Sequence, residues 1–126
     1  MQKIVPALCM VLLLVSSVCF AAAVDMRFVD AVDDVGYYVD VNSVNIISDT
    51  EAEASVGIII PARNRWYIYQ MHFNRAASTY QILKLSEFRY DTKEKLYSSD
   101  QPLEAKSYGN PSPIKSVVDF IYNNNS

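Results

Sequence analysis

Residues 66–90 carry the clearest pattern of strand-forming side chains in the chain, and they predict a central β-hairpin. Residues 66–73 are rich in aromatic and β-branched types, which suit a pleated, half-buried surface. A polar break at Asn74 and Arg75 is followed by a second run of strand length, as in a hairpin. Four side chains of the first arm would share one face of the sheet: Tyr67, Tyr69, Met71 and Phe73.

The segments before this hairpin also have the pattern of strands. Residues 26–32 and 37–41 predict a first hairpin, joined by the turn-forming residues 33–36. A polar break at residues 42–43 follows. Three apolar side chains are then expected to tuck a short connection onto the core: Val44, Ile46 and Ile47.

Residues 51–60 predict the next strand, because polar and apolar residues alternate over its first half. Ala52, Ala54 and Val56 would face inward. A helix could also be drawn through residues 51–54, but the apolar run that follows favours a strand.

The returning arm of the central hairpin has faces that are harder to assign, and we expect a β-bulge near residues 84–86. A polar turn at residues 91–94 leads into a further strand that begins at Leu96. Residues 100–110 have the composition of a loop.

The last element predicted is a helix. Ser112 can cap its N-terminus and Pro113 can occupy its first position, a pairing favoured at helix starts. An apolar stripe at helical spacing follows: Ile114, Val117, Val118 and Ile121. The predicted fold class is α+β, an antiparallel β-sheet meander closed by a C-terminal α-helix.

Residues 1–23 have the pattern of a cleaved secretory signal peptide. A basic start at Lys3 and an apolar middle lead to small residues at Ala21 and Ala23. Cleavage after Ala23 would leave residues 24–126 as a single small α+β domain. The expected location is therefore the periplasm, the cell surface or the medium.

This segment has two alternatives to cleavage, an uncleaved membrane anchor and a lipid attachment site. An uncleaved anchor is disfavoured because the apolar run is short for a membrane span. Lipid attachment at Cys19 is disfavoured because Val18 is not the small residue that such a site needs. Removal of the signal takes away Cys9 and Cys19, so the mature chain would lack disulfides and thiolate chemistry.

Charge and motif content narrow the function further. The chain has a net charge of −3, which argues against nucleic acid as a partner, and we expect no stable membrane insertion after signal cleavage. His72, the one histidine, has no clustered partners, and turn formation explains Asp33 and Asp34 without calcium. No nucleophile, base and orienting group are recognisable together. We therefore expect no enzyme activity, no cofactor and no metal.

The sequence contains nine tyrosines and one tryptophan. Such residues are enriched at protein interfaces, although they can equally fill a small core that lacks disulfides. The residues that flank the central strand are the best candidates for protein contact: Arg63, Arg65, Trp66 and Arg75.

The order of several short segments resembles the bacterial surface-adhesin E family. The segments are Tyr-Tyr-Val-Asp-Val-Asn-Ser-Val at residues 37–44, Phe-Asn-Arg at 73–75, Ser-Thr-Tyr-Gln-Ile-Leu at 78–83, Asp-Thr at 91–92 and Pro-Ser-Pro at 111–113. The resemblance implies a small exported protein with an antiparallel sheet and a C-terminal helix. It also implies a cysteine pair between the central strand and the last helix, where this chain has Arg75 and the neighbourhood of Tyr122.

The expected function is an exported, non-enzymatic binding protein, and by the resemblance an adhesin that contacts host matrix proteins. The alternative is a periplasmic inhibitor or accessory subunit of an envelope enzyme. A homodimer through a sheet edge is also possible, because unpaired edge strands can pair with a second copy.

Overall fold

The computed structural model describes residues 23–124, and it has the α+β architecture expected from the sequence. The strands are β1 (Met26–Val32), β2 (Val35–Asp40), β3 (Asn45–Ile46), β4 (Glu51–Ile60), β5 (Arg65–Asn74), β6 (Thr79–Arg89), β7 (Lys95–Ser99) and β8 (Lys106–Ser107). Two 3₁₀ turns, η1 (Val41–Ser43) and η2 (Pro61–Arg63), and the helix α2 (Pro113–Asn124) complete the described elements. The predicted signal peptide lies outside the described residues except for Ala23.

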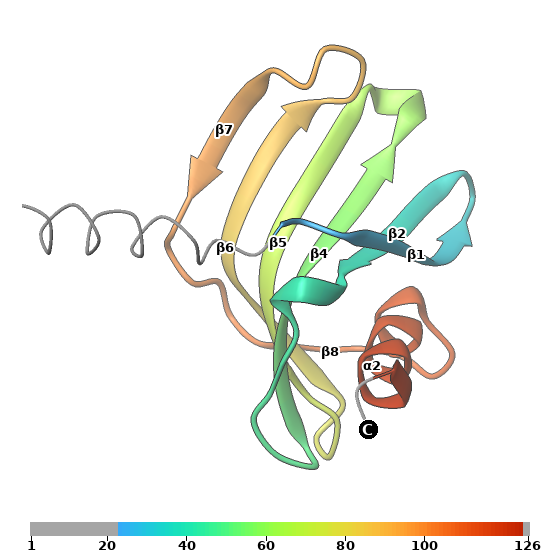
Figure 1. Ribbon diagram of the computed structural model, residues 1–126, viewed down its shortest axis with the longest axis vertical. Coiled ribbons are helices and arrows are strands. Elements are labelled where there is room, and N and C mark those ends of the chain that lie inside the picture. The colour runs from blue at the N-terminus through green and yellow to red at the C-terminus, as the bar shows by residue number, and fades with distance from the viewer. Residues whose placement is uncertain (1–22, 125–126) are drawn as a thin grey trace, which may run out of the picture.

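The strands form one open antiparallel sheet in the order β1-β2-β4-β5-β6-β7. The short strands β3 and β8 pair with β4 and β6. Figure 1 shows β4 to β7 as long curved ribbons, with η2 and the β6–β7 loop at one end and the β5–β6 turn at the other. Within residues 23–124, no helix is both long and apolar enough to cross a membrane.

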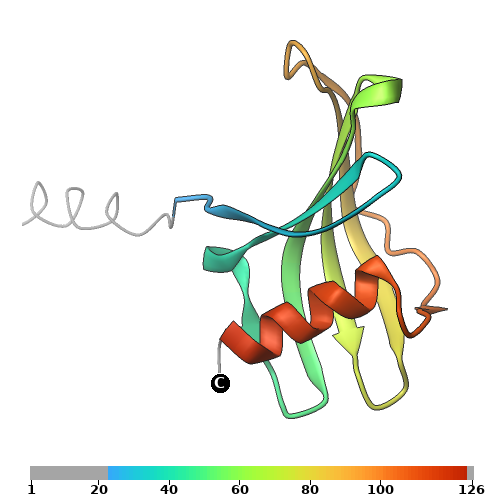
Figure 2. The same ribbon diagram turned by 90° about the vertical axis from the view of Figure 1, so that its right-hand side faces the viewer.

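The helix begins where its capping residues predict. The backbone N–H of Lys115 donates to the Ser112 Oγ at 3.1 Å, which satisfies one of the free donors at the helix start. The predicted stripe faces the sheet, with Val117, Val118 and Ile121 fully or almost fully buried and Ile114 packed beside them. Figure 2 shows the helix lying across the lower part of the sheet, so the upper part of that face extends beyond it.

Alternation along the strands supplies the other half of the core. The inward positions predicted on β4, namely Ala52, Ala54 and Val56, are fully buried. Register places them opposite Phe73, Met71 and Tyr69 of β5. Helix and sheet therefore share one core, with these buried residues: Val39, Ala52, Ala54, Val56, Met71, Phe73, Val117, Val118, Ile121 and Tyr122.

Several local expectations need correction. The turn of the first hairpin is shorter than predicted, with two residues, Asp33 and Asp34, whose φ angles of 50° and 65° suit a type I′ hairpin. The bulge in β6 falls at Leu83, just before the predicted position, since Gln70 pairs with Lys84 and Met71 with Ile82. β8 forms within the segment predicted to be a loop.

The connection after η1 packs differently from its prediction. Val44 does lie against the core, but Ile46 and Ile47 are 38% and 52% exposed, so their predicted burial is wrong. The physical reason is that β3 pairs with the first residues of β4, so its backbone rather than its side chains holds the segment in place.

Candidate functional site

The start of β5 sends two of the predicted contact residues to opposite faces of the sheet. Arg65 and Trp66 are consecutive residues of a strand, so their side chains alternate. Arg63 is exposed in η2, near the same end. Arg75 follows the other end of β5, about 30 Å away at about 3.3 Å per residue. The structure therefore does not gather the four residues into one surface.

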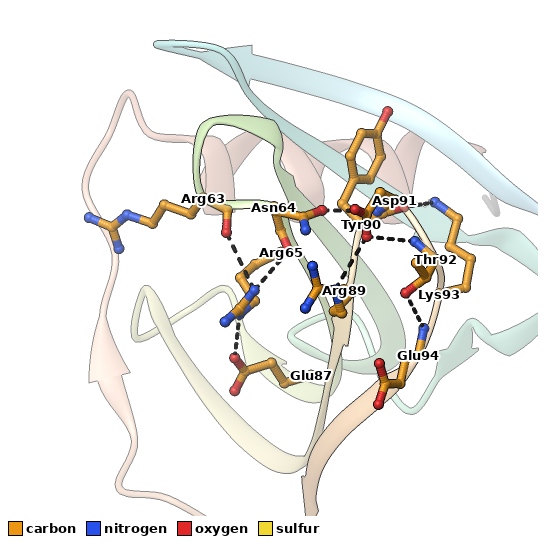
Figure 3. Close-up of polar contacts among 10 residues, drawn as sticks. All are labelled: Arg63, Asn64, Arg65, Glu87, Arg89, Tyr90, Asp91, Thr92, Lys93 and Glu94. Atoms are coloured by element: carbon orange, nitrogen blue, oxygen red, sulfur yellow. Dashed lines mark hydrogen bonds and ion pairs between the residues drawn. The ribbon is translucent and has the colours of Figure 1, made fainter.

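Arg65 is engaged within the fold. Its Nε lies 2.9 Å from the Glu87 Oε2 on the neighbouring strand, and its Nη1 donates to the carbonyl of Asn64 at 3.0 Å. Figure 3 shows the Arg63 guanidinium pointing away from this group. Arg65 thus holds the start of β5 against β6, while Arg63 is the freer of the two charges.

Hydrogen bonds lock η2 to the loop between β6 and β7. Asn64 adopts a left-handed backbone conformation, and its side-chain oxygen accepts from the backbone N–H of Asp91 at 2.9 Å. The Asn64 side chain is also the main cause that lowers the pKa of the Asp91 carboxyl. In the same loop, the Lys93 Nζ donates to the carbonyl of Tyr90 at 2.6 Å (Figure 3). This loop is therefore held in one shape above the end of the sheet.

The locked loop places a cation over aromatic rings. The Lys93 Nζ lies 4.3 Å from the centroid of the Tyr90 ring and 5.3 Å from that of the Trp66 ring. The Trp66 ring in turn packs on Phe88 across the strand pair, with a centroid distance of 5.1 Å. These distances lie within the usual range for cation–π and aromatic pairs.

A shallow pocket of about 200 Å³ opens beside Trp66. Its lining residues come from β1, β2, β4, β5 and the Lys93 loop: Met26, Tyr38, Ile59, Trp66 and Lys93. Gly57 lies at its edge, where an added Cβ would be 3.4 Å from the Trp66 Nε1 and 3.5 Å from the Met26 side chain. An added methyl group at Gly57 would therefore meet both side chains at ordinary van der Waals distance.

Further aromatic side chains extend this surface toward the edge of the sheet. Phe28 packs edge-on against Tyr38 at 5.6 Å and is 57% exposed, and Tyr90 is 37% exposed. Alternation puts the strand residues of this group on the face of the sheet opposite α2, and the Lys93 Nζ lies over the rings of Trp66 and Tyr90. We call it the Trp66 surface, and it consists of Met26, Phe28, Tyr38, Ile59, Trp66, Phe88, Tyr90 and Lys93.

Sequence reasoning found Trp66 but missed the rest of this surface. Alternation alone could place Trp66 and Phe88 on faces of their own strands. It could not show that Met26 and Tyr38 lie beside them, because that depends on the register between strands. Arg75 belongs elsewhere, since its guanidinium lies over the ring of Tyr122.

No metal-binding group is present among residues 23–124, where no cluster of three or more histidine, cysteine, aspartate or glutamate side chains occurs. The His72 Nε2 lies 3.2 Å from the Glu51 Oε1, a single pairing near the opposite end of β5. Comparisons with models of known families, with curated proteins and with solved structures find no match to the chain. The resemblance to the adhesin E family therefore stays a proposal.

Proposed function

We propose that the chain is an exported, non-enzymatic binding protein that contacts a protein partner through the Trp66 surface. The observation that carries this proposal is a group of partly exposed aromatic side chains on the face of the sheet that α2 leaves uncovered. Exposed aromatic patches rimmed by polar groups are typical of protein-contact sites. Tryptophan and tyrosine are also the residues in which interface binding energy concentrates.

The shape of the surface favours a protein over a drug-sized molecule. Its pocket of about 200 Å³ is smaller than the roughly 300–1,000 Å³ of ordinary small-molecule sites. Phe28 and Tyr90 extend the apolar area well beyond that pocket. A partner side chain would enter beside Trp66, and the partner's surrounding surface would cover Phe28.

The partner class follows from the predicted export and from the family resemblance. An adhesin would contact host matrix proteins, whereas the alternative, a periplasmic inhibitor or accessory subunit, would contact an envelope enzyme. Antibody labelling of intact cells separates the two, because only an adhesin must be reachable from outside. N-terminal sequencing should find Val24 first. A chain that still begins at Met1, or a lipid on Cys19, would contradict this form of export.

A pull-down with the exported protein, against host-matrix and envelope proteins in parallel, tests the binding surface. Trp66→Ala should weaken capture by at least about tenfold, as expected for an interface anchor. Phe28→Asp should weaken it as well, because a charge would enter an apolar contact. Since Phe28 is 57% exposed, this second change leaves folding largely unaffected.

The matched control is Tyr97→Ala, which removes an aromatic side chain that is 54% exposed on β7, outside the Trp66 surface. It should change capture by less than about twofold. If Tyr97→Ala and Phe28→Asp weakened partner capture equally, the interface would not be the Trp66 surface. Size measurement of the same samples checks the predicted self-association through the edge strands β1 and β7.

A further inference from the structure

The helix side of the sheet carries a second aromatic site, next to the first turn of α2. A pocket of about 250 Å³ is lined there by Tyr37 of β2, Tyr69 of β5 and Tyr80 of β6. Ile58, Met71 and Ile82 form its apolar part, and the start of the helix closes one side. Three tyrosines from three different strands thus converge beside the start of the helix. Figure 2 shows that the helix covers only the lower part of this face.

The Tyr69 side chain lines this pocket and stacks on a neighbouring tyrosine. Tyr67 stacks on Tyr69 with centroids 5.8 Å apart and ring planes 12° from parallel, so it covers one face of that ring. Met71, the next residue on this face of β5, lines the pocket, whereas Tyr67 does not. Since Tyr67 covers one face of the Tyr69 ring, the opposite face and the ring edge are left for contact with a ligand in the pocket.

Carboxylates stand at both sides of the site. Register aligns Asp30 with Tyr37 and Glu87 with Tyr67, so both acids share the face of the tyrosines. The Asp30 carboxylate accepts a hydrogen bond from the Ser116 Oγ at 2.8 Å and has no ion-pair partner within residues 23–124. Glu87 is paired with Arg65. No lysine or arginine lines the pocket.

This environment keeps the phenols neutral and disfavours negative charge. Burial, followed by Asp30, raises the pKa of Tyr37. Burial is also the largest cause that raises the pKa of Tyr69 to about 12, with Tyr67 and Glu87 adding to it. Neutral aromatic rings present their negatively charged faces to a cation, which is how aromatic cages hold ammonium groups.

We propose that this tyrosine pocket binds the ammonium group of a small organic cation. Ring faces attract the charge, the Asp30 carboxylate, unpaired within residues 23–124, adds a favourable field, and no basic lining residue opposes it. The apolar floor of Ile58, Met71 and Ile82 would contact the methyl or methylene groups of the ligand. A volume of about 250 Å³ suits an ammonium head group rather than a drug-sized molecule.

The test is titration of the exported protein with choline and with its neutral isostere 3,3-dimethylbutan-1-ol, followed by NMR of labelled tyrosine rings. The two probes differ in charge but hardly in shape. Choline should shift the signals of the pocket tyrosines and bind at least about fivefold tighter than the alcohol, because only choline gains the cation–π term. Equal affinities, or no shift with choline, would overturn the proposal.

Variants locate the binding. Tyr69→Leu should weaken choline binding about tenfold, whereas Tyr69→Phe keeps the ring and should stay within about threefold. Tyr97→Leu, outside the pocket, should bind choline as the unchanged protein does. If Tyr69→Leu does not fold, Asp30→Asn decides the matter. It keeps the shape of the side chain and should weaken choline binding at low salt, and an unchanged affinity would contradict the site.

Two sources can supply such a cation, a free quaternary amine or a lysine side chain on a partner. A parallel titration with N-acetyl-lysine amide distinguishes them by which probe binds tighter, and binding of neither overturns the proposal. Trp66 lies on the opposite face of the sheet, so Trp66→Ala should leave choline binding unchanged. Failure of the Trp66 interface and failure of this pocket are therefore separate outcomes.

Discussion

The Arg75 guanidinium lies 3.7 Å from the centroid of the Tyr122 ring and so joins the β5–β6 turn to the last turn of α2. The family resemblance implies a cysteine pair between these same two segments. Here the link is non-covalent and is extended by hydrogen bonds to a third segment. The Arg75 Nε donates to the carbonyl of Asp49 at 2.5 Å, and the Tyr122 hydroxyl donates to the carbonyl of Ser48 at 3.1 Å.

Arg75→Met should lower the free energy of unfolding by about 1 kcal/mol, because it removes a cation–π contact and a hydrogen bond at a partly solvated site. Urea denaturation measures the change. Arg63→Met is the matched control, since Arg63 is exposed and its guanidinium forms no hydrogen bond or ion pair within residues 23–124, and it should stay within about 0.5 kcal/mol. Equal effects of the two substitutions would show that the Arg75–Tyr122 contact contributes nothing.

Ile121→Ala should cost about 2–5 kcal/mol, because it opens a cavity between helix and sheet at a fully buried position. Ile47→Ala removes the same atoms where the side chain is 52% exposed, and it should cost far less. Thermal or denaturant unfolding compares the two proteins directly. A small loss for Ile121→Ala would mean that α2 is an appendage of a self-sufficient sheet.

Ser112→Ala should cost about 1 kcal/mol through loss of the helix cap. The Ser112 Oγ accepts from the Lys115 backbone and also donates to the carbonyl of Gly109 at 2.7 Å, so both partners would lose a bond. Ser112→Asn, which can still cap, should recover part of the loss in the same denaturation assay. An alanine variant as stable as the unchanged protein would show that the Ser112 cap does not stabilise α2.

Stability should fall at alkaline pH partly because of Tyr69. Its pKa is about 12 in the folded protein, mainly through burial, against about 10 for an unfolded tyrosine. A raised folded-state pKa contributes stability that is complete below about pH 10 and is lost as the pH rises through about 12. Tyr69→Phe cannot ionise, so its unfolding free energy should decline less over this range. The pKa values of Tyr37 and Tyr122 are also raised. The variant should therefore still lose some stability as the pH rises.

The control for this pH series is Tyr97→Phe, because Tyr97 is 54% exposed. Urea denaturation at several pH values should give this variant the same alkaline decline as the unchanged protein. If Tyr69→Phe also followed the unchanged curve, the buried phenol would not be the group that titrates.

His72→Ala should change the midpoint of unfolding and partner capture very little, within about 0.5 kcal/mol. Its pairing with Glu51 is a single contact whose partner side chain is 41% exposed. Such surface pairs contribute little. A large loss of stability or binding, or stoichiometric zinc in purified protein, would reveal a site at His72.

Local pattern was sufficient to predict the long strands, the helix and the buried faces of β4 and α2. Alternation marked Ala52, Ala54 and Val56 as inward positions, and helical spacing marked Val117 and Ile121, because these periods are fixed by backbone geometry within a few residues. Ser112 and Pro113 marked the start of the helix for the same reason, since a cap acts over only three or four residues.

Only the tertiary structure decided which of these faces meet and which surfaces remain open. Trp66 lies beside Met26, 40 positions earlier in the chain, because three strand registers (β1–β2, β2–β4 and β4–β5) bring them together, and a shift of one residue would separate them. The tyrosine pocket likewise needs four strands and the start of α2. Arg75 meets Tyr122 through the packing of the helix on the sheet. Such contacts depend on chain segments far apart in sequence, so no periodicity within one segment can specify them.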